Sequence, residues 1–149
     1  MNKKIFYVSI FLVLVLFLSG CTGGYPTVSD PSIDLVDIAV IKNVVHEYLL
    51  ALSNQNWSKA QNLCVYGSDR YYATLSLETA VNGLYQMGHY KVTILSSMMI
   101  SNVNVTNNIA IVEGVASSVI CADANCENRI VPTAYYLQKM GSLWKIYGP

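Results

Sequence analysis

Residues 134–149 read AYYLQKMGSLWKIYGP, and this stretch decides the fold. Two apolar runs flank Gly141-Ser142, a pair that suits the two-residue turn of a β-hairpin. The turn sets Met140 opposite Leu143. The resulting register pairs Lys139 with Trp144, Gln138 with Lys145, Leu137 with Ile146, and Tyr136 with Tyr147.

Alternation of side chains divides this hairpin into two faces, since successive residues of a strand point to opposite sides. The more apolar face holds Tyr135, Leu137, Trp144 and Ile146. We predict that it packs on helices, while Lys139 reaches past its edge along its aliphatic stem. The opposite face holds Tyr136, Gln138, Lys145 and Tyr147.

Three more segments upstream have strand character, so the expected strands span residues 90–105, 109–121, 128–140 and 143–147. Short polar turns separate them, as in an antiparallel meander. The apolar phase of the first strand slips at residues 96–99, which predicts a bulge there. Gly114 predicts a bend in the second strand.

Helical patterns precede the strands, and the expected helices span residues 32–53, 57–65 and 76–87. In the first, one apolar stripe recurs at steps of three and four residues. Its members are Ile38, Ile41, Val45, Leu49 and Leu52. Helices followed by an antiparallel meander indicate an α+β fold, with N-terminal helices packed on a bent sheet of about four long strands.

Two stretches carry a resemblance to a known superfamily. VVHEYLLALSNQNWSKAQNLC, residues 44–64, resembles the opening of nuclear transport factor 2-like domains, and residues 134–149 resemble their closing hairpin. The resemblance implies a cone-shaped, cystatin-like α+β fold with a pocket between sheet and helices. It implies no single activity, because that fold hosts isomerases, dehydratases, cyclases and pure binding domains.

A ligand pocket is predicted between Trp144, Tyr135 and the first helix, because binding sites are concave and mostly apolar. Its expected lining is Ile41, Val45, Tyr48, Leu49, Glu113, Tyr135, Leu137, Trp144 and Ile146.

Glu113 is the carboxylate of most interest in this lining. It alternates in phase with Ile109, Ile111 and Val115, so pleating puts it on their face. If that face forms the pocket, desolvation raises its pKa as a general base requires. A phase shift at Gly114 would instead turn it to solvent.

The N-terminus predicts where the protein works. Lys3 and Lys4 precede an apolar run, residues 5–18, that is shorter than the ~20 residues of a membrane span and fits a signal peptide. Leu18-Ser19-Gly20-Cys21 resembles the lipobox of prokaryotic lipoproteins, in which the cysteine receives lipid and becomes the new N-terminus. We therefore expect a leader at 1–20, a lipidated Cys21 (palmitate among its acyl chains) with a tether to residue 31, and one domain at 32–149.

The expected location is thus the extracytoplasmic side of the cell membrane. Removal of Lys3 and Lys4 from a chain with nine basic and nine acidic residues leaves a net charge of −2. That charge does not favour nucleic acid as a partner. The expected partners are the membrane, through Cys21, and a small apolar ligand or an envelope protein.

Cys121 and Cys126 flank a predicted turn, which brings strand ends within bridging distance in an oxidising compartment. We expect a disulfide. A zinc site is the alternative, with His46 and His89 as the remaining soft ligands. Cys64 is expected to be a buried thiol, and no sequence pattern points to a cofactor.

Three functions remain open at this point. The first is a binding domain without catalysis. The second is an enzyme resembling ketosteroid isomerase or polyketide cyclase, with Glu113 as base and Tyr48, Tyr85 or Tyr135 as hydrogen-bond donor. The third is a structural role in the cell envelope.

Overall fold

The computed structural model describes residues 35–149, so the leader, Cys21 and the tether lie outside the described residues. Three helices come first: α2 (Leu35–Ser53), α3 (Trp57–Asn62) and α4 (Asp69–Gln86). Four strands come after them: β1 (Val92–Thr106), β2 (Ile109–Ala122), β3 (Asn125–Met140) and β4 (Leu143–Gly148). No helix among the described residues is long and apolar enough to cross a bilayer.

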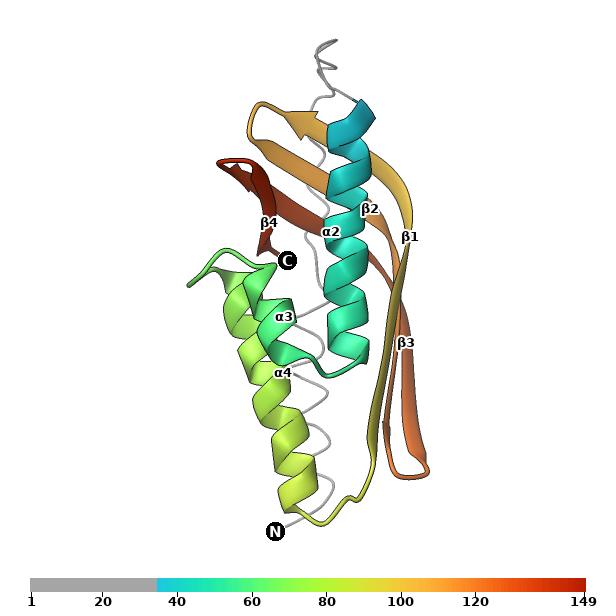
Figure 1. The fold of residues 1–149 in the computed structure, drawn as a ribbon. Helices are drawn as coiled ribbons and strands as arrows, with labels where there is room; N and C mark the ends of the chain where they lie inside the picture. Colours follow the sequence, from blue (N-terminus) through green and yellow to red (C-terminus); the bar gives the residue numbers. More distant parts are fainter. Residues whose placement is uncertain (1–34) are drawn as a thin grey trace.

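The strands form one antiparallel sheet in the order β1-β2-β3-β4, and all three helices lie on the same side of it. The long strands curve around α2, as Figure 1 shows. The predicted α+β class and the bent four-stranded meander are confirmed. This arrangement gives the sheet an inner face toward the helices and an outer face away from them.

The closing hairpin has the predicted register from Met140↔Leu143 through Leu137↔Ile146. Beyond it a shift pairs Tyr136 with Gly148, not with Tyr147. Trp144 is buried, and its indole Nε1 donates to Asp37 Oδ1 at 3.3 Å.

Lys139 also meets Asp37, with its ammonium 3.0 Å from Oδ2 and 5.5 Å from the centre of the Trp144 ring. These contacts join the first turn of α2 to the end of the sheet. The hydrogen bonds from Lys139 and Trp144 lower the pKa of Asp37.

The bulge lies further along β1 than predicted. The register shifts between Ile100 and Asn102, not at 96–99, where Met98 faces inward and Met99 outward in regular alternation. Gly114 lies opposite Ile100, and a Cβ there would come within 2.2 Å of the Met99 carbonyl oxygen. The close approach of the two strands at the bulge therefore requires glycine at this position.

The third helix begins seven residues before the prediction, at Asp69. Ser68 is its N-cap, and the serine hydroxyl accepts a hydrogen bond from Tyr71 N at 3.3 Å. Gly67-Ser68-Asp69 has loop composition, but its serine starts a helix.

The second helix ends three residues before the prediction, because the chain after Asn62 joins the sheet. Val65 N donates to Ile146 O at 2.7 Å, and Ile146 N donates to Leu63 O at 2.9 Å. Cys64 thus forms a parallel bridge beside β4 and is buried.

Candidate functional site

Eight of the nine predicted pocket residues come together on the helix side of the sheet. They are buried and pack against one another in the core: Ile41, Val45, Tyr48, Leu49, Tyr135, Leu137, Trp144 and Ile146. Their side chains fill the space in which the ligand pocket was predicted. Two of them, Leu49 and Tyr135, also line a neighbouring cavity.

Glu113 is not part of this group, and its predicted place in the pocket is wrong. Its in-phase neighbours were identified correctly, but the face they share is the outer one. The inner residues of β2 are the alternate set, Ala110, Val112, Ala116 and Ser118. Glu113 is exposed and accepts a hydrogen bond from Asn102 Nδ2 at 3.0 Å.

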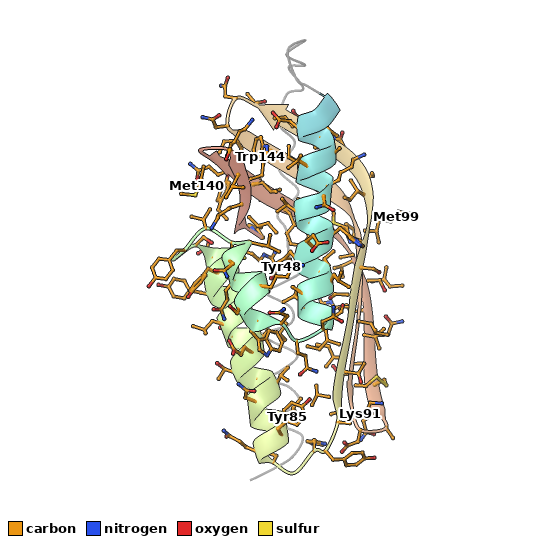
Figure 2. All side chains as sticks on the ribbon, in the orientation of Figure 1. Tyr48, Tyr85, Lys91, Met99, Met140 and Trp144 are labelled. Atoms are coloured by element: carbon orange, nitrogen blue, oxygen red, sulfur yellow. A yellow bond between two sulfur atoms is a disulfide. The ribbon has the colours of Figure 1, made fainter. Side chains whose placement is uncertain are left out.

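The proposed catalytic pairing fails with it. Tyr48 and Tyr135 are buried on the inner side, away from Glu113. Tyr85 lies near the end of α4, where its hydroxyl contacts Gln55 Oε1 at 3.4 Å (Figure 2). None of the three tyrosines can therefore share a substrate with Glu113 as base and hydrogen-bond donor.

The inner side instead holds a buried arginine that the sequence-based prediction missed. Arg70 is 2% exposed, and its guanidinium carbon lies 4.6 Å from the centre of the Tyr135 ring and 5.9 Å from that of Tyr48. The two rings meet edge to face at 6.0 Å. A guanidinium against aromatic faces gains cation–π attraction, which strengthens where water is excluded.

Hydrogen bonds through Thr74 connect the Tyr48 ring to helix α4. Thr74 Oγ1 donates to the Arg70 carbonyl oxygen at 2.8 Å, so the Tyr48 hydroxyl is the donor in its 2.9 Å contact with Thr74 Oγ1. Burial raises the pKa of Tyr48 and of Tyr135, so both phenols are neutral at pH 7. Burial also raises the pKa of the Cys64 thiol to about 11, which leaves it unreactive.

A signal for Arg70 exists in the sequence. The buried positions of α4 are Arg70, Thr74, Leu77, Val81 and Leu84, at alternating steps of four and three. This spacing marks one face of a helix. Starting the helix at Ser68 would have placed Arg70 on the inner stripe.

A cavity of about 30 Å³ lies beside Arg70, between the helices and the inner face of the sheet. It is partly open to solvent, and that volume holds about two water molecules. Its wall is mostly apolar, and the serines of β1 and β2 add hydroxyl groups, among them Ser118. Ser118 is 6% exposed, and its hydroxyl oxygen has no hydrogen-bond partner among the described residues.

The outer face of the sheet is unusually apolar. Leu95, Met99 and Ile130 are 58%, 74% and 64% exposed. Figure 2 shows Met99 on the side of the sheet away from the helices. Leu95 pairs with Val119 and Met99 with Val115, and Ile130 pairs with Ser117 in the row between them. We call the apolar members of this set the outer patch: Leu95, Met99, Val115, Val119 and Ile130.

One end of the outer face is fixed by covalent and polar contacts. Cys121 and Cys126 face each other across the β2–β3 hairpin and form the predicted disulfide, with an S–S distance of 2.06 Å. In the turn between them, Asp123 accepts hydrogen bonds from Tyr90 N and Lys91 N, and His89 Nδ1 lies 2.9 Å from its carboxylate. Among the described residues, no three His, Cys, Asp or Glu side chains gather as ligands for a metal ion.

Comparison with known proteins identifies the fold. No protein-family model matches the chain, and no curated protein matches it significantly. Solved structures do match. The chain is similar to a protein from Novosphingobium aromaticivorans described as NTF2-like with a cystatin-like fold, at 13% identity and a TM-score of 0.54, over 78% of this chain and 88% of that one.

Two other similar structures come from larger or functionally different proteins. Bd1075 of Bdellovibrio bacteriovorus matches at 17% identity and a TM-score of 0.54, over 72% of this chain and 37% of its own length. The chain therefore spans little more than a third of that protein. The beta subunit of benzoate 1,2-dioxygenase from Burkholderia mallei matches at 13% identity and a TM-score of 0.57, over 80% and 89% of the two chains.

These likenesses are too low in identity to transfer an activity, and they concern the fold alone. Together with the helix order and the open antiparallel sheet, they show that the described domain has the nuclear transport factor 2-like, cystatin-like fold.

Proposed function

We propose that this protein is a lipid-anchored, non-catalytic binding domain that holds a protein partner on the outer face of its sheet. The observation that carries the proposal is the outer patch. An antiparallel sheet with one face on helices usually turns polar side chains to water on the other. Here the exposed face carries large aliphatic side chains, which mark interaction sites when they are contiguous.

The chemistry of the patch indicates what kind of partner it binds. Four successive rows of outward-facing neighbours on β1, β2 and β3, from Thr93 to Met99, contain no charged side chain. With strands ~4.8 Å apart and rows ~7 Å apart, these rows cover roughly 400 Å², in which aliphatic side chains are interspersed with the small polar side chains of Thr93, Ser97, Ser117 and Asn128. Glu113 and Asn102 begin a polar border next to it. An apolar centre with a polar border is the anatomy of a protein interface, so the partner should present an apolar, uncharged surface.

The space on the inner side of the sheet favours a protein partner on the outer face over a small apolar ligand on the inner side. Drug-sized ligands occupy pockets of roughly 300–1,000 Å³. The cavity beside Arg70 is about 30 Å³, and the larger hollow of about 320 Å³ between α2 and β1 is an open groove with Lys42, Asn43 and His46 in its wall. Glu113 is exposed on the face opposite Tyr48 and Tyr135, which removes the basis for an isomerase-like or cyclase-like mechanism.

The anchor is supported by the sequence alone, through Leu18-Ser19-Gly20-Cys21 after a short apolar run. Lipid on Cys21 would hold the domain at the extracytoplasmic surface, where the Cys121–Cys126 disulfide is stable. Intact mass of the membrane-extracted protein tests this proposal. We expect an N-terminus at a lipid-modified Cys21, and any other N-terminus contradicts the anchor.

Site-specific photo-cross-linking in cells tests the interaction surface. A photoreactive residue at Met99 should give one discrete protein adduct, and the same residue at Tyr72, exposed on α4, should not. Adding Ile130→Lys should remove the adduct, because it places a charge in the patch. An adduct of twice the chain mass identifies the partner as a second copy. Equal adducts from both positions, or one that survives Ile130→Lys, contradict the proposal.

A further inference from the structure

The free edge of strand β1 has features that the proposed function does not use. Because β1 pairs only with β2, no strand among the described residues lies along its other edge. Helix α2 lies beside this strand (Figure 1), and an open groove of about 320 Å³ separates the two. A strand edge is a row of backbone N–H and C=O groups, and it can pair with another chain unless something covers it.

One hydrogen bond identifies the residues of β1 whose backbone is directed to this edge. Ser96 N donates to Ser53 Oγ at 2.8 Å, and Ser53 is the last residue of α2. The N–H of Ser96 therefore points away from β2 and toward the helix. Backbone groups alternate between the two edges of a strand, so Met98 and Ile100 direct their N–H groups to the same edge as Ser96.

The edge is closed at Ser96 and open beyond it. The hydroxyl of Ser53 occupies the N–H of Ser96. No described side chain makes an equivalent hydrogen bond to the backbone of Met98 or Ile100, and both residues line the groove. Their backbone groups at this edge are therefore available to an added strand.

The opposite wall of the groove is polar and carries a positive charge. Helix α2 contributes Lys42, Asn43 and His46, all of them exposed. Lys42 has no ionic partner among the described residues, and no carboxylate of the described residues lines the groove. Opposite charges attract across such a short space. An occupant should therefore present a negative group to α2.

The dimensions of the groove suit a short extended chain. Its lining on α2 runs from Ala39 to Leu49, which corresponds to ~15 Å of helix. An added strand covers that length with about four residues at ~3.4 Å each. A second copy of the chain, paired through its own β1, would bring no negative charge, because residues 92–106 contain no acidic residue. The charge of the groove thus favours a different, acidic segment.

We propose that the free edge of β1 binds an extended acidic peptide segment of another protein as an additional strand. The backbone of the segment pairs with Met98 and Ile100. A carboxylate side chain that points toward α2 meets Lys42, with Asn43 and His46 as hydrogen-bond donors beside it. Strand addition takes its affinity from backbone hydrogen bonds and its specificity from alternate side chains. This edge is distinct from the outer patch, so the segment need not belong to the partner proposed there.

Amide hydrogen exchange of the full chain in detergent, resolved by residue with NMR, tests the site. The probe is the peptide acetyl-Thr-Val-Asp-Val-Thr-amide. We expect the peptide to slow exchange at Met98 and Ile100 in a saturable way. Exchange at Ser96 should not change, because its N–H is already bonded to Ser53. No slowing at Met98 and Ile100 overturns the proposal. Slow exchange there before peptide is added, including slowing that grows with protein concentration through a second copy, also overturns it.

Two methylated forms of the peptide test whether the contact is a strand pairing. Only one edge of an added strand faces β1, and the amide nitrogens on that edge belong to alternate residues. Methylation of one alternate set of peptide nitrogens should abolish the slowing at Met98. Methylation of the other set should leave the slowing intact. Equal effects of the two methylated peptides contradict a strand pairing.

The charge requirement is tested with a peptide in which Asn replaces Asp, and with Lys42→Gln. Either change should weaken binding roughly threefold, as for the loss of an exposed ion pair. Lys42→Gln should not affect binding of the Asn peptide. Lys91→Gln, at an exposed lysine outside the groove, is the matched control and should bind the Asp peptide like the natural protein. Equal binding of the Asp and Asn peptides to the natural protein contradicts the acidic segment.

Discussion

The two faces of strand β2 differ in a way that runs against simple expectation. Its inner residues are small or medium-sized: Ala110, Val112, Ala116 and Ser118, all buried. Its outer residues include larger aliphatic side chains: Ile109, Ile111, Val115 and Val119, none of them buried. Residue size alone would assign the core to the wrong side of this strand.

The difference has a physical origin in what covers each face. Helix α2 and large side chains such as Tyr48 and Tyr135 occupy the inner side, so β2 contributes small residues there to keep the interior close-packed. On the outer side no element among the described residues covers β2. Large apolar side chains on an uncovered face gain nothing for the isolated domain, and this is why we assign that face to a partner.

The largest difference between the two faces is expected at the β3–β4 hairpin, where the aromatic residues Trp144 and Tyr147 lie on opposite faces of the sheet. Trp144→Ala should lower the free energy of unfolding by about 3–5 kcal/mol, because the indole is buried against Asp37 and α2. Tyr147→Ala should cost much less, because its ring is half-buried and lies against the Tyr136 ring on the outer face. Urea denaturation measures both, and equal losses would contradict the register.

A second test uses adjacent residues of β1. Ile94 is buried on the inner face and Leu95 is exposed in the outer patch. Ile94→Ala should cost about 2–5 kcal/mol. Leu95→Ala should change stability by no more than about 0.5 kcal/mol, as for an exposed site. The same urea measurements apply, and a large loss for Leu95→Ala would mean that the outer face supports the isolated domain.

Loss of the disulfide at the end of the outer face should have a smaller effect on the free energy of unfolding. The bond closes a short loop, so the chain-entropy relation gives about 2 kcal/mol for its removal. Replacement of Cys121 and Cys126 by serine should lower Tm without loss of the fold. A reducing agent should lower the Tm of the natural protein by a similar amount. A reductant that leaves Tm unchanged would show that the bond does not constrain this hairpin.

The smallest effect on stability is expected for a substitution of Asp123. The pKa of Asp123 is lowered by its hydrogen bond with His89 and by those from two backbone N–H groups. A carboxyl whose folded pKa lies below its unfolded value stabilises the fold above the unfolded pKa, near 4. That contribution is lost as pH falls through the folded pKa. Asp123→Asn should therefore lower Tm at pH 7 and flatten its decline below about pH 4. Parallel Tm–pH curves for the two proteins would contradict the coupling.

These results show what local sequence patterns can and cannot predict. The Gly141-Ser142 turn and the alternation around it were sufficient for the β3–β4 register, because two-residue turns permit few alternatives. The Cys121–Cys126 pair followed from the same kind of turn geometry. Both features depend on residues that are close in sequence.

Features that depend on distant residues were predicted poorly. Glu113 was assigned to a pocket because its in-phase neighbours are aliphatic, whereas the inner face is decided by where α2 and the aromatic side chains lie. Arg70 was overlooked because a charged residue is rarely buried, and its position depends on contacts with residues distant in sequence, among them the rings of Tyr48 and Tyr135. The N-cap role of Ser68 at the start of α4 could have revealed Arg70, but the loop-like composition around it hid that role.

Thiol labelling tests most directly whether a protein covers the outer patch in the native membrane. Met99→Cys and Tyr72→Cys place a thiol in the patch and on α4, respectively, at positions that are exposed in the isolated domain. Background reaction should be low, because Cys64 is buried with a pKa of about 11 and Cys121 is bonded to Cys126. The two variants are labelled with a maleimide reagent in native membranes and again after purification.

We predict that the thiol at position 99 reacts slowly in native membranes and rapidly after purification, while the thiol at position 72 reacts rapidly in both. Purified protein returned to lipid vesicles at low density should keep the rapid reaction at position 99, which separates a protein partner from the lipid surface. Equally rapid labelling of position 99 in native membranes and in purified protein would show that nothing covers the patch, and would contradict the proposed function.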